Sequence, residues 1–246
     1  MATKGLPTGP EIKEHSQKEG QPGVQQEMES PPEITRLPTQ HGHSDKLVLE
    51  EYVGVGKLKG RRAIVTGGDS GIGLSAAVMM AREGARGIAI VHHPKEQSDA
   101  DKAKKAIEKE GAKCLLLPRD ISEGEHVCKE IVEAVVKEWG GIDIVINNAA
   151  IQHVVPSVTD TSADVLEQTF RTNIFPMFYF AKYAVPHMAR GSSIINSTSV
   201  TAYHGSPSLL EYSSTKGAIV TFTRSLAKQL APKGIRVNAV APGPVS

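Results

Sequence analysis

The sequence has few cysteines, few aromatic residues and no long apolar run. Its two cysteines, Cys114 and Cys128, have the spacing of neither a metal site nor a redox motif, so we expect reduced thiols and no bound metal. Reduced thiols are typical of intracellular proteins, and we expect a cytoplasmic location. No stretch reaches the roughly 18 uncharged apolar residues that a membrane-spanning helix needs. The N-terminus carries Lys4, Glu11 and Lys13 without an apolar run, which argues against a secretory signal.

The chain also lacks an excess of charge of either sign. Its 28 basic and 27 acidic side chains give a formal net charge of +1. It has no basic stripe and no interleaved set of aromatic residues, which nucleic-acid-binding proteins commonly use. We therefore expect neither a nucleic acid nor a membrane surface as a partner.

Residues 1–45 differ in composition from the rest of the chain. They are rich in Pro, Gly, Gln, Glu and Ser and show no apolar periodicity. Such a segment buries too little apolar surface to offset the entropy lost on ordering. We expect a flexible N-terminal tail, or a tail laid over a neighbouring subunit, followed by one domain over residues 46–246.

Short apolar runs alternate with amphipathic stretches in that domain. The runs predict strands at 63–65, 87–91, 114–117, 142–146, 193–196 and 236–240. The amphipathic stretches predict helices at 72–83, 98–110, 122–139, 162–188 and 212–230. We expect a capping box of Ser122 and Glu125 to open the third helix, and a break near Asn173 and Pro176 in the fourth. Together these elements indicate an α/β fold, a doubly wound parallel sheet with helices on both faces.

A glycine-rich turn joins the first strand to the first helix, and it reads Thr66-Gly67-Gly68-Asp69-Ser70-Gly71-Ile72-Gly73. Glycines permit a tight turn and a close approach of the backbone to a pyrophosphate. The helix N-terminus adds free N–H groups and a partial positive charge. Glycine also marks ordinary turns, and the spacing is not the common G-x-G-x-x-G, so the motif alone leaves both a nucleotide site and a plain turn open.

Tyr212 and Lys216 are four residues apart and share one face of the last predicted helix. A tyrosine ordinarily has a pKa near ~10, and we expect the nearby ammonium to lower it. A tyrosine so tuned can give its proton to a carbonyl oxygen during reduction and take it back during oxidation. Ser199, at the end of the fifth strand, is placed to donate to the same oxygen. The pair also occurs by chance, so its weight comes from the glycine turn and Ser199.

Taken together, these motifs resemble the short-chain dehydrogenase/reductase family. The matching pieces appear in family order from Arg61 to the C-terminus: the glycine turn, Asp120-Ile121, Asn147-Asn148-Ala149-Ala150, Asn173, Ser199, Tyr212-x-x-x-Lys216 and Pro242-Gly243. The glycine turn and the Pro- and Gln-rich N-terminal segment are most similar to the aldehyde-reductase-like, glucose/ribitol-dehydrogenase-like subgroup. The resemblance implies a Rossmann fold, a nicotinamide dinucleotide cofactor, a small-molecule carbonyl or alcohol substrate, and a homodimer or homotetramer.

The resemblance also implies roles for the matching residues. Ser199 holds the substrate oxygen, Tyr212 is the general acid/base, and Lys216 also binds the nicotinamide ribose. Asn173 interrupts its helix and helps to order a water relay to Lys216. The implied cofactor contacts are Thr66, Gly67, Asp69, Ser70, Gly71, Ile72, Gly73, Asp120, Ile121, Asn147, Ala149, Tyr212, Lys216, Pro242 and Gly243. For Asn147-Asn148, a plain turn at the end of a strand is the alternative.

Two features depart from the family pattern. Ala150 stands where the family has glycine, and a methyl group is tolerable there if the backbone does not need a positive φ. The chain stops at Ser246, whereas family members continue for several dozen residues. We therefore expect a last strand, a last helix and the segment that covers the substrate to be missing, which leaves the sixth strand as an open edge.

The end of the second strand indicates which nicotinamide cofactor is preferred. An NAD site usually has an acidic residue there, but this sequence continues with His92, His93 and Lys95. These side chains suit a 2′-phosphate, although Asp69 and Ser70 lack the basic residue that many NADP sites carry in the glycine turn. The sequence favours NADP(H) over NAD(H), with a solvated loop as the alternative role of the two histidines.

Two functions are consistent with the sequence. The first is an NADP(H)-dependent oxidoreductase that interconverts a carbonyl (aldehyde, ketone or sugar) and an alcohol by hydride transfer. It would act in general carbonyl metabolism or in one tailoring step of specialised metabolism. The alternative, motivated by the expected C-terminal truncation, is a non-catalytic cofactor-binding or remnant protein. The substrate is not readable from the residues expected to select it: Gln152, His153, Tyr203 and His204.

Overall fold

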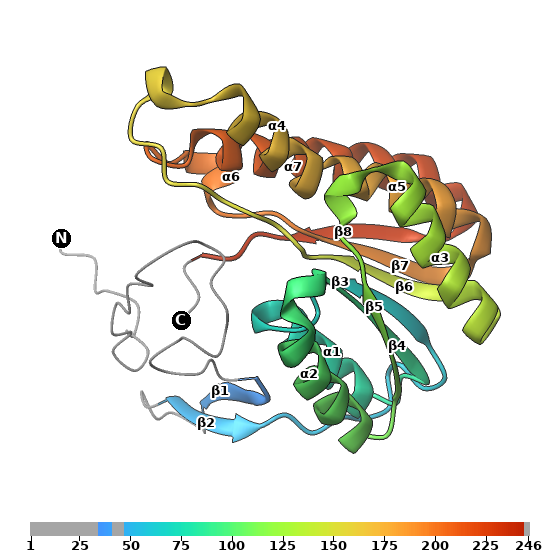
Figure 1. The fold of residues 1–246 in the computed structure, drawn as a ribbon. Helices are drawn as coiled ribbons and strands as arrows, with labels where there is room; N and C mark the ends of the chain where they lie inside the picture. The colour runs from blue at the N-terminus through green and yellow to red at the C-terminus, as the bar shows by residue number, and fades with distance from the viewer. Residues whose placement is uncertain (1–33, 41–46, 244–246) are drawn as a thin grey trace.

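The computed structural model describes residues 34–40 and 47–243, and a six-stranded parallel sheet forms its centre (Figure 1). The strands are β3 (Arg62–Thr66), β4 (Gly87–His92), β5 (Lys113–Pro118), β6 (Ile142–Asn147), β7 (Met188–Ser197) and β8 (Arg236–Val240). Their order across the sheet is β5-β4-β3-β6-β7-β8. The chain builds one half outward from β3 and then the other half from β6, which is the strand order of a doubly wound Rossmann fold. The predicted fold class is confirmed.

Helices cover both faces of this sheet (Figure 1). One face carries α1 (Gly71–Arg82) and α2 (Gln97–Lys109), and the other carries α3 (Glu125–Trp139), α5 (Phe175–Ala184) and α7 (Leu210–Leu230). α4 (Ala163–Asn173) packs on α7, as does the short α6 (Thr201–His204). Single-turn 3-10 helices are η2 (Pro94–Glu96), η3 (Ile121–Glu123), η4 (Val158–Asp160), η5 (Val185–His187) and η6 (Ala231–Lys233). All residues of β4 and β6 are buried, as expected for strands covered on both faces.

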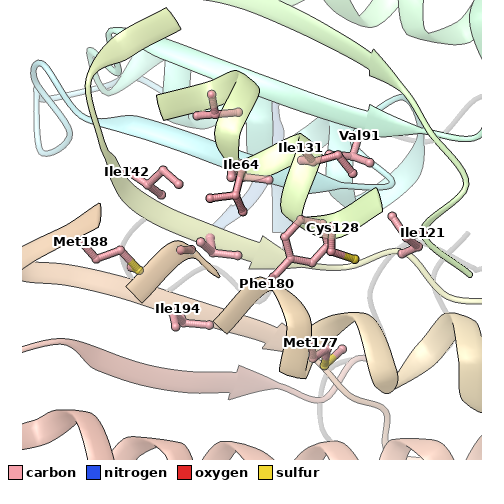
Figure 2. Packing of buried hydrophobic residues seen from close by; sticks show 14 of the residues in the cluster. Ile64, Val91, Ile121, Cys128, Ile131, Ile142, Met177, Phe180, Met188 and Ile194 are labelled. Atoms are coloured by element: carbon pink, nitrogen blue, oxygen red, sulfur yellow. The ribbon is translucent and has the colours of Figure 1, made fainter. Parts of the chain in front are cut away.

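The sheet divides the core into two apolar clusters. The larger cluster lies under α3, α5 and α7 and includes Ile131, Phe180 and Ile194 (Figure 2). The smaller cluster lies under α1 and α2 and includes Val65 and Ile107. Burying each such side chain contributes roughly 1.5–3 kcal/mol. The loops at the carboxyl edge of the sheet therefore stand on a rigid base.

The helical region over 162–188 is broken where the sequence predicts a break. α4 ends at Asn173, and Ile174 leaves helical geometry with φ −125° and ψ −43°. α5 then begins at Phe175 with Pro176 in its first turn. Proline lacks an N–H group and fits only the first turn of a helix, so Pro176 cannot continue α4.

The predicted capping box of the third helix is wrong. Ser122 lies in η3, and its N–H group donates to Asp120 at 2.9 Å. Gly124, with φ of +125°, is the residue that precedes α3. Asp120 therefore competes for the local N–H groups, and the chain needs one more turn before the long helix begins.

A two-stranded antiparallel hairpin precedes the sheet. It consists of β1 (Arg36–Gln40) and β2 (Leu47–Glu51). Residues 36–40, which composition places in the tail, therefore form a strand; residues 1–33 and 41–46 lie outside the described residues. The side chains of β1 are exposed apart from half-buried Thr39, so the strand has no apolar alternation that a sequence pattern could detect.

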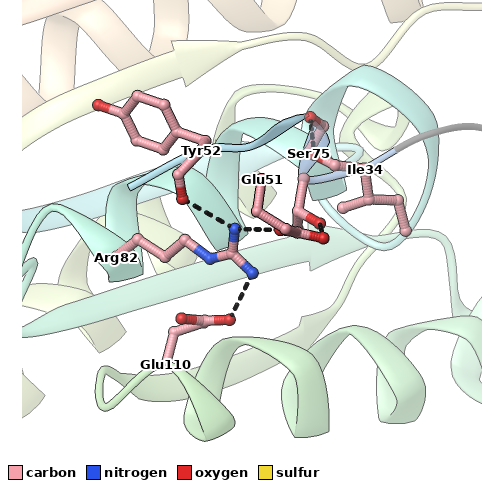
Figure 3. Close-up of polar contacts among 7 residues, drawn as sticks. Ile34, Glu51, Tyr52, Ser75, Arg82 and Glu110 are labelled. Carbon is pink, nitrogen blue, oxygen red and sulfur yellow. Dashed lines mark hydrogen bonds and ion pairs between the residues drawn. The ribbon is translucent and has the colours of Figure 1, made fainter. Parts of the chain in front are cut away.

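Residues 34–40 and 47–59, here called the N-terminal strap, lie against α1 (Figure 3). Arg82, at the end of α1, donates to Glu51 at 2.7 Å, to the Tyr52 carbonyl at 3.0 Å and to Glu110 at 2.9 Å. Near the start of the same helix, the Ser75 hydroxyl donates to the Ile34 carbonyl at 2.6 Å. The strap therefore holds α1 near both of its ends.

Glu83 anchors the second part of the strap. Its carboxylate accepts from the Tyr52 hydroxyl and from the backbone N–H groups of Val55 (3.2 Å) and Lys57 (2.7 Å). The Tyr52 hydrogen bond is the main cause of its lowered pKa. A Cβ at Gly54 would lie 2.1 Å from the Arg82 carbonyl oxygen. The strap backbone thus touches the backbone at the end of α1, which only glycine permits.

Three further features bear on function. Within the described part of the chain, no helix has the length and apolar character required to cross a bilayer. Among the same residues, no three His, Cys, Asp or Glu side chains are grouped so that they could hold a metal ion. Cys114 and Cys128 are free and buried, and burial raises the pKa of each thiol to about 12, which makes both unreactive at neutral pH.

Candidate active site

The glycine turn follows β3 at the carboxyl edge of the sheet, beside the point where the strand order reverses. Open α/β sheets bind their ligands at this edge. Gly67 and Gly71 have φ of +61° and +50°, values that strongly favour glycine. The Gly67 N–H group donates to the Val91 carbonyl at 2.8 Å, which fixes the turn to the end of β4.

Thr66 ties this turn to the loop after β6. Its hydroxyl oxygen accepts from the backbone N–H groups of Asn148 and Ala149 at 2.9 and 3.1 Å. The Asn148 side chain in turn donates to the Gly67 carbonyl at 3.1 Å. A Cβ at Gly73 would lie 1.9 Å from the same carbonyl oxygen. The turn, the first helix and the loop after β6 therefore form one rigid unit.

The N-terminus of α1 has the properties of an anion site. Ser70 is its N-cap but makes no side-chain capping bond, and the first turn contains no acidic residue. The positive end of the helix dipole faces the turn. Among the described residues, a Cβ at Gly71 would meet nothing within 4 Å, so these residues leave space beside this end of the helix. These features fit the pyrophosphate of a dinucleotide.

Asp69 is the acidic residue of the turn. Its side chain is 4% exposed, and Oδ1 has no hydrogen-bond partner among the described residues. Burial and then the negative charge of Glu96 raise the pKa of Asp69 to about 6, and Asp99 acts in the same direction. At neutral pH the turn therefore holds a buried negative charge.

The basic residues after β4 lie in different environments. His92 is 2% exposed, and its Nδ1 lies 3.0 Å from the His93 carbonyl oxygen. His93 caps η2 by accepting from the Lys95 N–H group at 3.1 Å, and its Nε2 lies 3.7 Å from Asp120. Lys95 is exposed. Its ammonium group lies in solvent, whereas the contact between His92 and a cofactor stays a prediction.

Asp120 and Ile121 follow β5, the next strand of the same half of the sheet. Asp120 accepts from the N–H group and the hydroxyl of Ser122 at 2.9 and 2.7 Å. Ile121 is buried in the larger core cluster. The loop after β5 is therefore held from both sides, by a local cap and by the core.

The Asn147 side chain is turned into the protein. It donates to Asn196 at 2.8 Å, Asn196 donates to Thr223 at 2.9 Å, and Thr223 donates to the Ile219 carbonyl at 2.8 Å. This buried series of hydrogen bonds joins β6, β7 and α7. Asn196 and Thr223 were not predicted, although an asparagine at the end of two adjacent strands was visible in the sequence. Ala149 lies beside the turn, because a Cβ on Gly67 would sit 3.1 Å from its Cα.

Tyr212 and Lys216 lie near the start of α7, close to the end of β7. The Lys216 ammonium lies 5.2 Å from the centre of the Tyr212 ring and donates to the Ser197 carbonyl at 2.9 Å. The Thr198 hydroxyl donates to the Lys216 carbonyl at 2.7 Å. Ser199 follows Thr198 in the chain, and its hydroxyl lies close enough to Tyr212 to act on the pKa of that residue. The three groups that the motif predicted are thus brought together.

Burial governs the ionisation of this group. It raises the pKa of Tyr212, while the neighbouring Ser199 hydroxyl acts in the opposite direction. Burial also lowers the pKa of Lys216 to about 8. The expected lowering of the Tyr212 pKa by the ammonium is therefore not seen. The reason is that the phenolate loses its hydration, and the Lys216 ammonium is bound to the Ser197 carbonyl.

Asn173 uses its side chain to hold the loop after β6. Its Oδ1 accepts from the Ile151 N–H group at 2.8 Å, and its Nδ2 donates to the Ile151 carbonyl at 2.9 Å and to Thr215 at 3.1 Å. Both amide hydrogens are used. The Met177 N–H group, which would reach the Asn173 carbonyl in a continuous helix, donates to Ile174 at 3.1 Å. The backbone carbonyl is therefore the Asn173 group left for the expected water relay.

The segment after β8 runs beside Ser199. The Pro242 carbonyl accepts from the Val200 N–H group at 3.0 Å, which places Pro242 and Gly243 next to the loop that follows β7. Across the described ranges, no residue other than glycine has a positive φ. Ala150 therefore has a conformation that tolerates its methyl group, as expected.

An apolar surface lies on α4 and α5. Leu166, Phe175 and Phe178 are large apolar side chains that remain exposed there. A shallow pocket on this surface is lined by Leu166, Glu167, Phe170, Arg171 and Phe175. None of its lining residues belongs to the Ser199–Tyr212–Lys216 group, so this pocket is separate from the candidate catalytic groups.

Comparisons with known proteins place this geometry in a family. The short chain dehydrogenase model matches residues 61–246. Glucose and ribitol dehydrogenase homolog 2 of Arabidopsis thaliana is 47% identical over 231 residues, 92% of this chain and 75% of that protein. NADPH-dependent aldehyde reductase 1, chloroplastic, of the same plant is 42% identical over 236 residues, 94% of this chain and 77% of that protein.

Comparison with solved structures supports the same family. A short chain dehydrogenase from Burkholderia cenocepacia J2315 in complex with NADP superposes with a TM-score of 0.71 at 32% identity, over 76% of this chain and 75% of that one. The chain spans between 65% and 77% of the length of the curated relatives compared. The range matched by the family model contains the glycine turn, Ser199, Tyr212 and Lys216, and the chain belongs to the short-chain dehydrogenase/reductase family of oxidoreductases.

Proposed function

We propose that this protein is an NADP(H)-dependent oxidoreductase that interconverts a carbonyl compound and an alcohol at a site formed by Ser199, Tyr212 and Lys216. The observation that carries the proposal is the position of Tyr212, whose pKa is affected by the neighbouring Ser199 hydroxyl and which has the buried Lys216 ammonium 5.2 Å from its ring centre. A hydroxyl donor, an acid/base group and a cation are thus gathered after β7, at the same carboxyl edge of the sheet as the glycine turn.

The residues have distinct tasks in this proposal. The Ser199 and Tyr212 hydroxyl groups hold the substrate oxygen, and during reduction Tyr212 gives its hydroxyl proton to that oxygen. The Lys216 ammonium stabilises the phenolate that remains. The nicotinamide, when bound, supplies the hydride in this direction and accepts it in the other. Because the pKa of Tyr212 is raised, the residue is protonated at neutral pH, which suits reduction; alcohol oxidation is favoured at higher pH.

The preference for NADP(H) is part of the proposal. It is supported by the absence of an acidic residue at the end of β4, by the exposed Lys95, and by the name of one relative and the ligand of one structural neighbour. The negative charge of Asp69 acts against a 2′-phosphate.

Lys95→Glu is expected to weaken NADPH binding and leave NADH binding nearly unchanged. Lys109→Glu, at the far end of α2, makes the same charge change as a control; equal effects on both cofactors would contradict the preference.

We also propose that copies of the chain associate through the apolar surface on α4 and α5. Its support is the exposure of Leu166, Phe175 and Phe178 on adjacent turns of two helices. Sedimentation of the wild type is expected to give a dimer or a tetramer, and Phe178→Glu is expected to shift it towards the monomer. A wild type that sediments as a monomer at micromolar concentration would refute this part.

The catalytic proposal is tested by turnover. The purified chain is mixed with NADPH or NADH and a panel of aldehydes, ketones and sugars, and nicotinamide absorbance is followed. We expect oxidation of NADPH with at least one carbonyl, and its loss in Tyr212→Phe, with NADPH binding retained. Binding without turnover across the whole panel would instead favour a non-catalytic cofactor-binding protein.

A further inference from the structure

One buried hydroxyl connects the loop after β6 with the catalytic turn of α7. Thr215 is fully buried, and its hydroxyl donates to the Tyr212 carbonyl at 2.7 Å. The same oxygen accepts from Asn173 Nδ2 at 3.1 Å. Both the hydrogen and a lone pair of this hydroxyl are therefore used, one toward each side of the site.

From Thr215, the hydrogen bonds continue through Asn173 to the loop after β6. Asn173 binds both backbone groups of Ile151, with its oxygen on the N–H group and its nitrogen on the carbonyl. Further along, the Val155 N–H group donates to the Ser208 carbonyl at 2.9 Å, which ties the loop to the segment before α7. The loop that leaves β6 is thus positioned relative to Tyr212 through Asn173 and Thr215.

Burial makes the connection stiff. Asn173 is 1% exposed and Thr215 has no exposed surface. Hydrogen bonds are strong away from water, and a buried amide N–H group that loses its acceptor is unfavourable. Without the Thr215 hydroxyl, one Asn173 hydrogen loses its acceptor, and the amide is held by its two bonds to Ile151 alone.

We propose that Thr215 is a positioning residue that sets the place of Tyr212 relative to the Ile151 loop and the Asn173 carbonyl. The inference rests on the proposed carbonyl–alcohol reaction. It assigns no contact with substrate or cofactor to Thr215. A displacement of about 1 Å at a reacting group can reduce turnover strongly, so a residue that acts only through others still affects the rate.

The same helix offers a matched control. Thr223 lies two turns further along α7 and has the same pair of bonds: it donates to the Ile219 carbonyl at 2.8 Å and accepts from Asn196 at 2.9 Å. Thr223→Val therefore removes a buried hydroxyl from an equivalent arrangement that does not include Tyr212 or Asn173. A general loss of helix stability affects both variants, whereas a positioning effect is confined to Thr215.

The test compares Thr215→Val, Thr215→Ser and Thr223→Val by kcat, KM, NADPH binding and amide hydrogen exchange. We expect Thr215→Val to lower kcat by about tenfold or more, with less than about a twofold change in the Kd of NADPH, and to speed exchange at Ile151. Thr215→Ser, which keeps the hydroxyl, is expected to retain kcat within about twofold, and Thr223→Val is expected to leave hydrogen exchange at Ile151 unchanged. If the valine variant does not fold, Thr215→Ala removes the same hydroxyl.

Wild-type kcat in Thr215→Val, or hydrogen exchange at Ile151 that is accelerated equally in Thr223→Val, would overturn the proposal. A wild type without turnover on any carbonyl refutes the proposed function and leaves hydrogen exchange to decide this inference. In that case, Ile151 exchange that is the same in the wild type and in Thr215→Val would refute the link itself.

Discussion

The Cα of Gly73 faces the carbonyl oxygen of Gly67 so closely that a Cβ would lie 1.9 Å from that oxygen. Alanine at position 73 must therefore displace the turn. We expect Gly73→Ala to lower the free energy of unfolding by about 1–3 kcal/mol and to abolish the thermal stabilisation given by NADPH.

Gly217 provides the control for this substitution. It lies inside α7, and a Cβ there would meet nothing within 4 Å. Gly217→Ala is expected to stabilise the protein by about 0.5–1 kcal/mol, because alanine loses less backbone entropy in a helix. Thermal unfolding of both variants with and without NADPH checks the pair. An NADPH shift that survives in Gly73→Ala would disprove the role assigned to the turn.

The Thr66 hydroxyl accepts two backbone N–H groups, and its removal leaves both without that acceptor. We expect Thr66→Val to cost about 1–3 kcal/mol in urea unfolding and to weaken cofactor binding, since the glycine turn loses its tie to the loop after β6. Thr66→Ser keeps the acceptor and is expected to bind the cofactor like the wild type. Cofactor binding by Thr66→Val as tight as that by Thr66→Ser would show that the hydroxyl acceptor is not needed.

Asp69 predicts a dependence of stability on pH. Its pKa is raised from 3.8 to about 6 in the folded protein, so between these values the folded state binds more protons than the unfolded state. Stability linked to Asp69 therefore falls as the pH rises from about 4 to 6, by up to about 3 kcal/mol, and stays low above pH 6.

Asp69→Asn removes this titration. We expect the variant to be more stable than the wild type at pH 7.5, by about 1–3 kcal/mol in free energy, and to keep only about a third of this gain at pH 4.5. Thermal unfolding at the two pH values checks the difference. A gain of equal size at both pH values would mean that the charge of Asp69 is not its source.

The contacts of Glu83 with the N-terminal strap predict a local loss of stability when this carboxylate is removed. Glu83→Gln weakens the bonds from Tyr52, Val55 and Lys57, and we expect a lower Tm and faster hydrogen exchange at the Val55 and Lys57 amides. Glu133→Gln is a matched change on the surface, where Glu133 makes only an exposed pair with Lys129. It is expected to leave the Tm almost unchanged. Similar shifts in both variants would show that the Glu83 contacts do not hold the strap.

The sequence predicted the parts of the fold that have local signals. Alternating apolar runs located the six strands of the sheet, and Pro176 located the break after Asn173. The strand Arg36–Gln40 was missed because its side chains are exposed and its order comes from contacts with α1 through the strap. Such contacts join residues far apart in the chain, and periodicity does not report them.

The candidate site also has one part that the sequence predicted and one part that it did not. Ser199, Tyr212 and Lys216 follow from motif spacing, and the structure brings them together. Thr215 and Asn196 were not predicted, since their importance lies in bonds to partners 27 or more residues away. The direction of the Tyr212 pKa was also missed, because burial is a property of the folded chain.

The position of β3 has a consequence for how the protein is made. β3 pairs with β4 within the first half of the sheet, but its other edge pairs with β6, about 80 residues later. At about 5–20 residues per second, a ribosome needs roughly 4–16 s to supply that partner. During this interval one edge of the most central apolar strand is open, and a nascent chain in this state is prone to pair wrongly. Chaperone demand is therefore expected to peak before residue 147 has emerged.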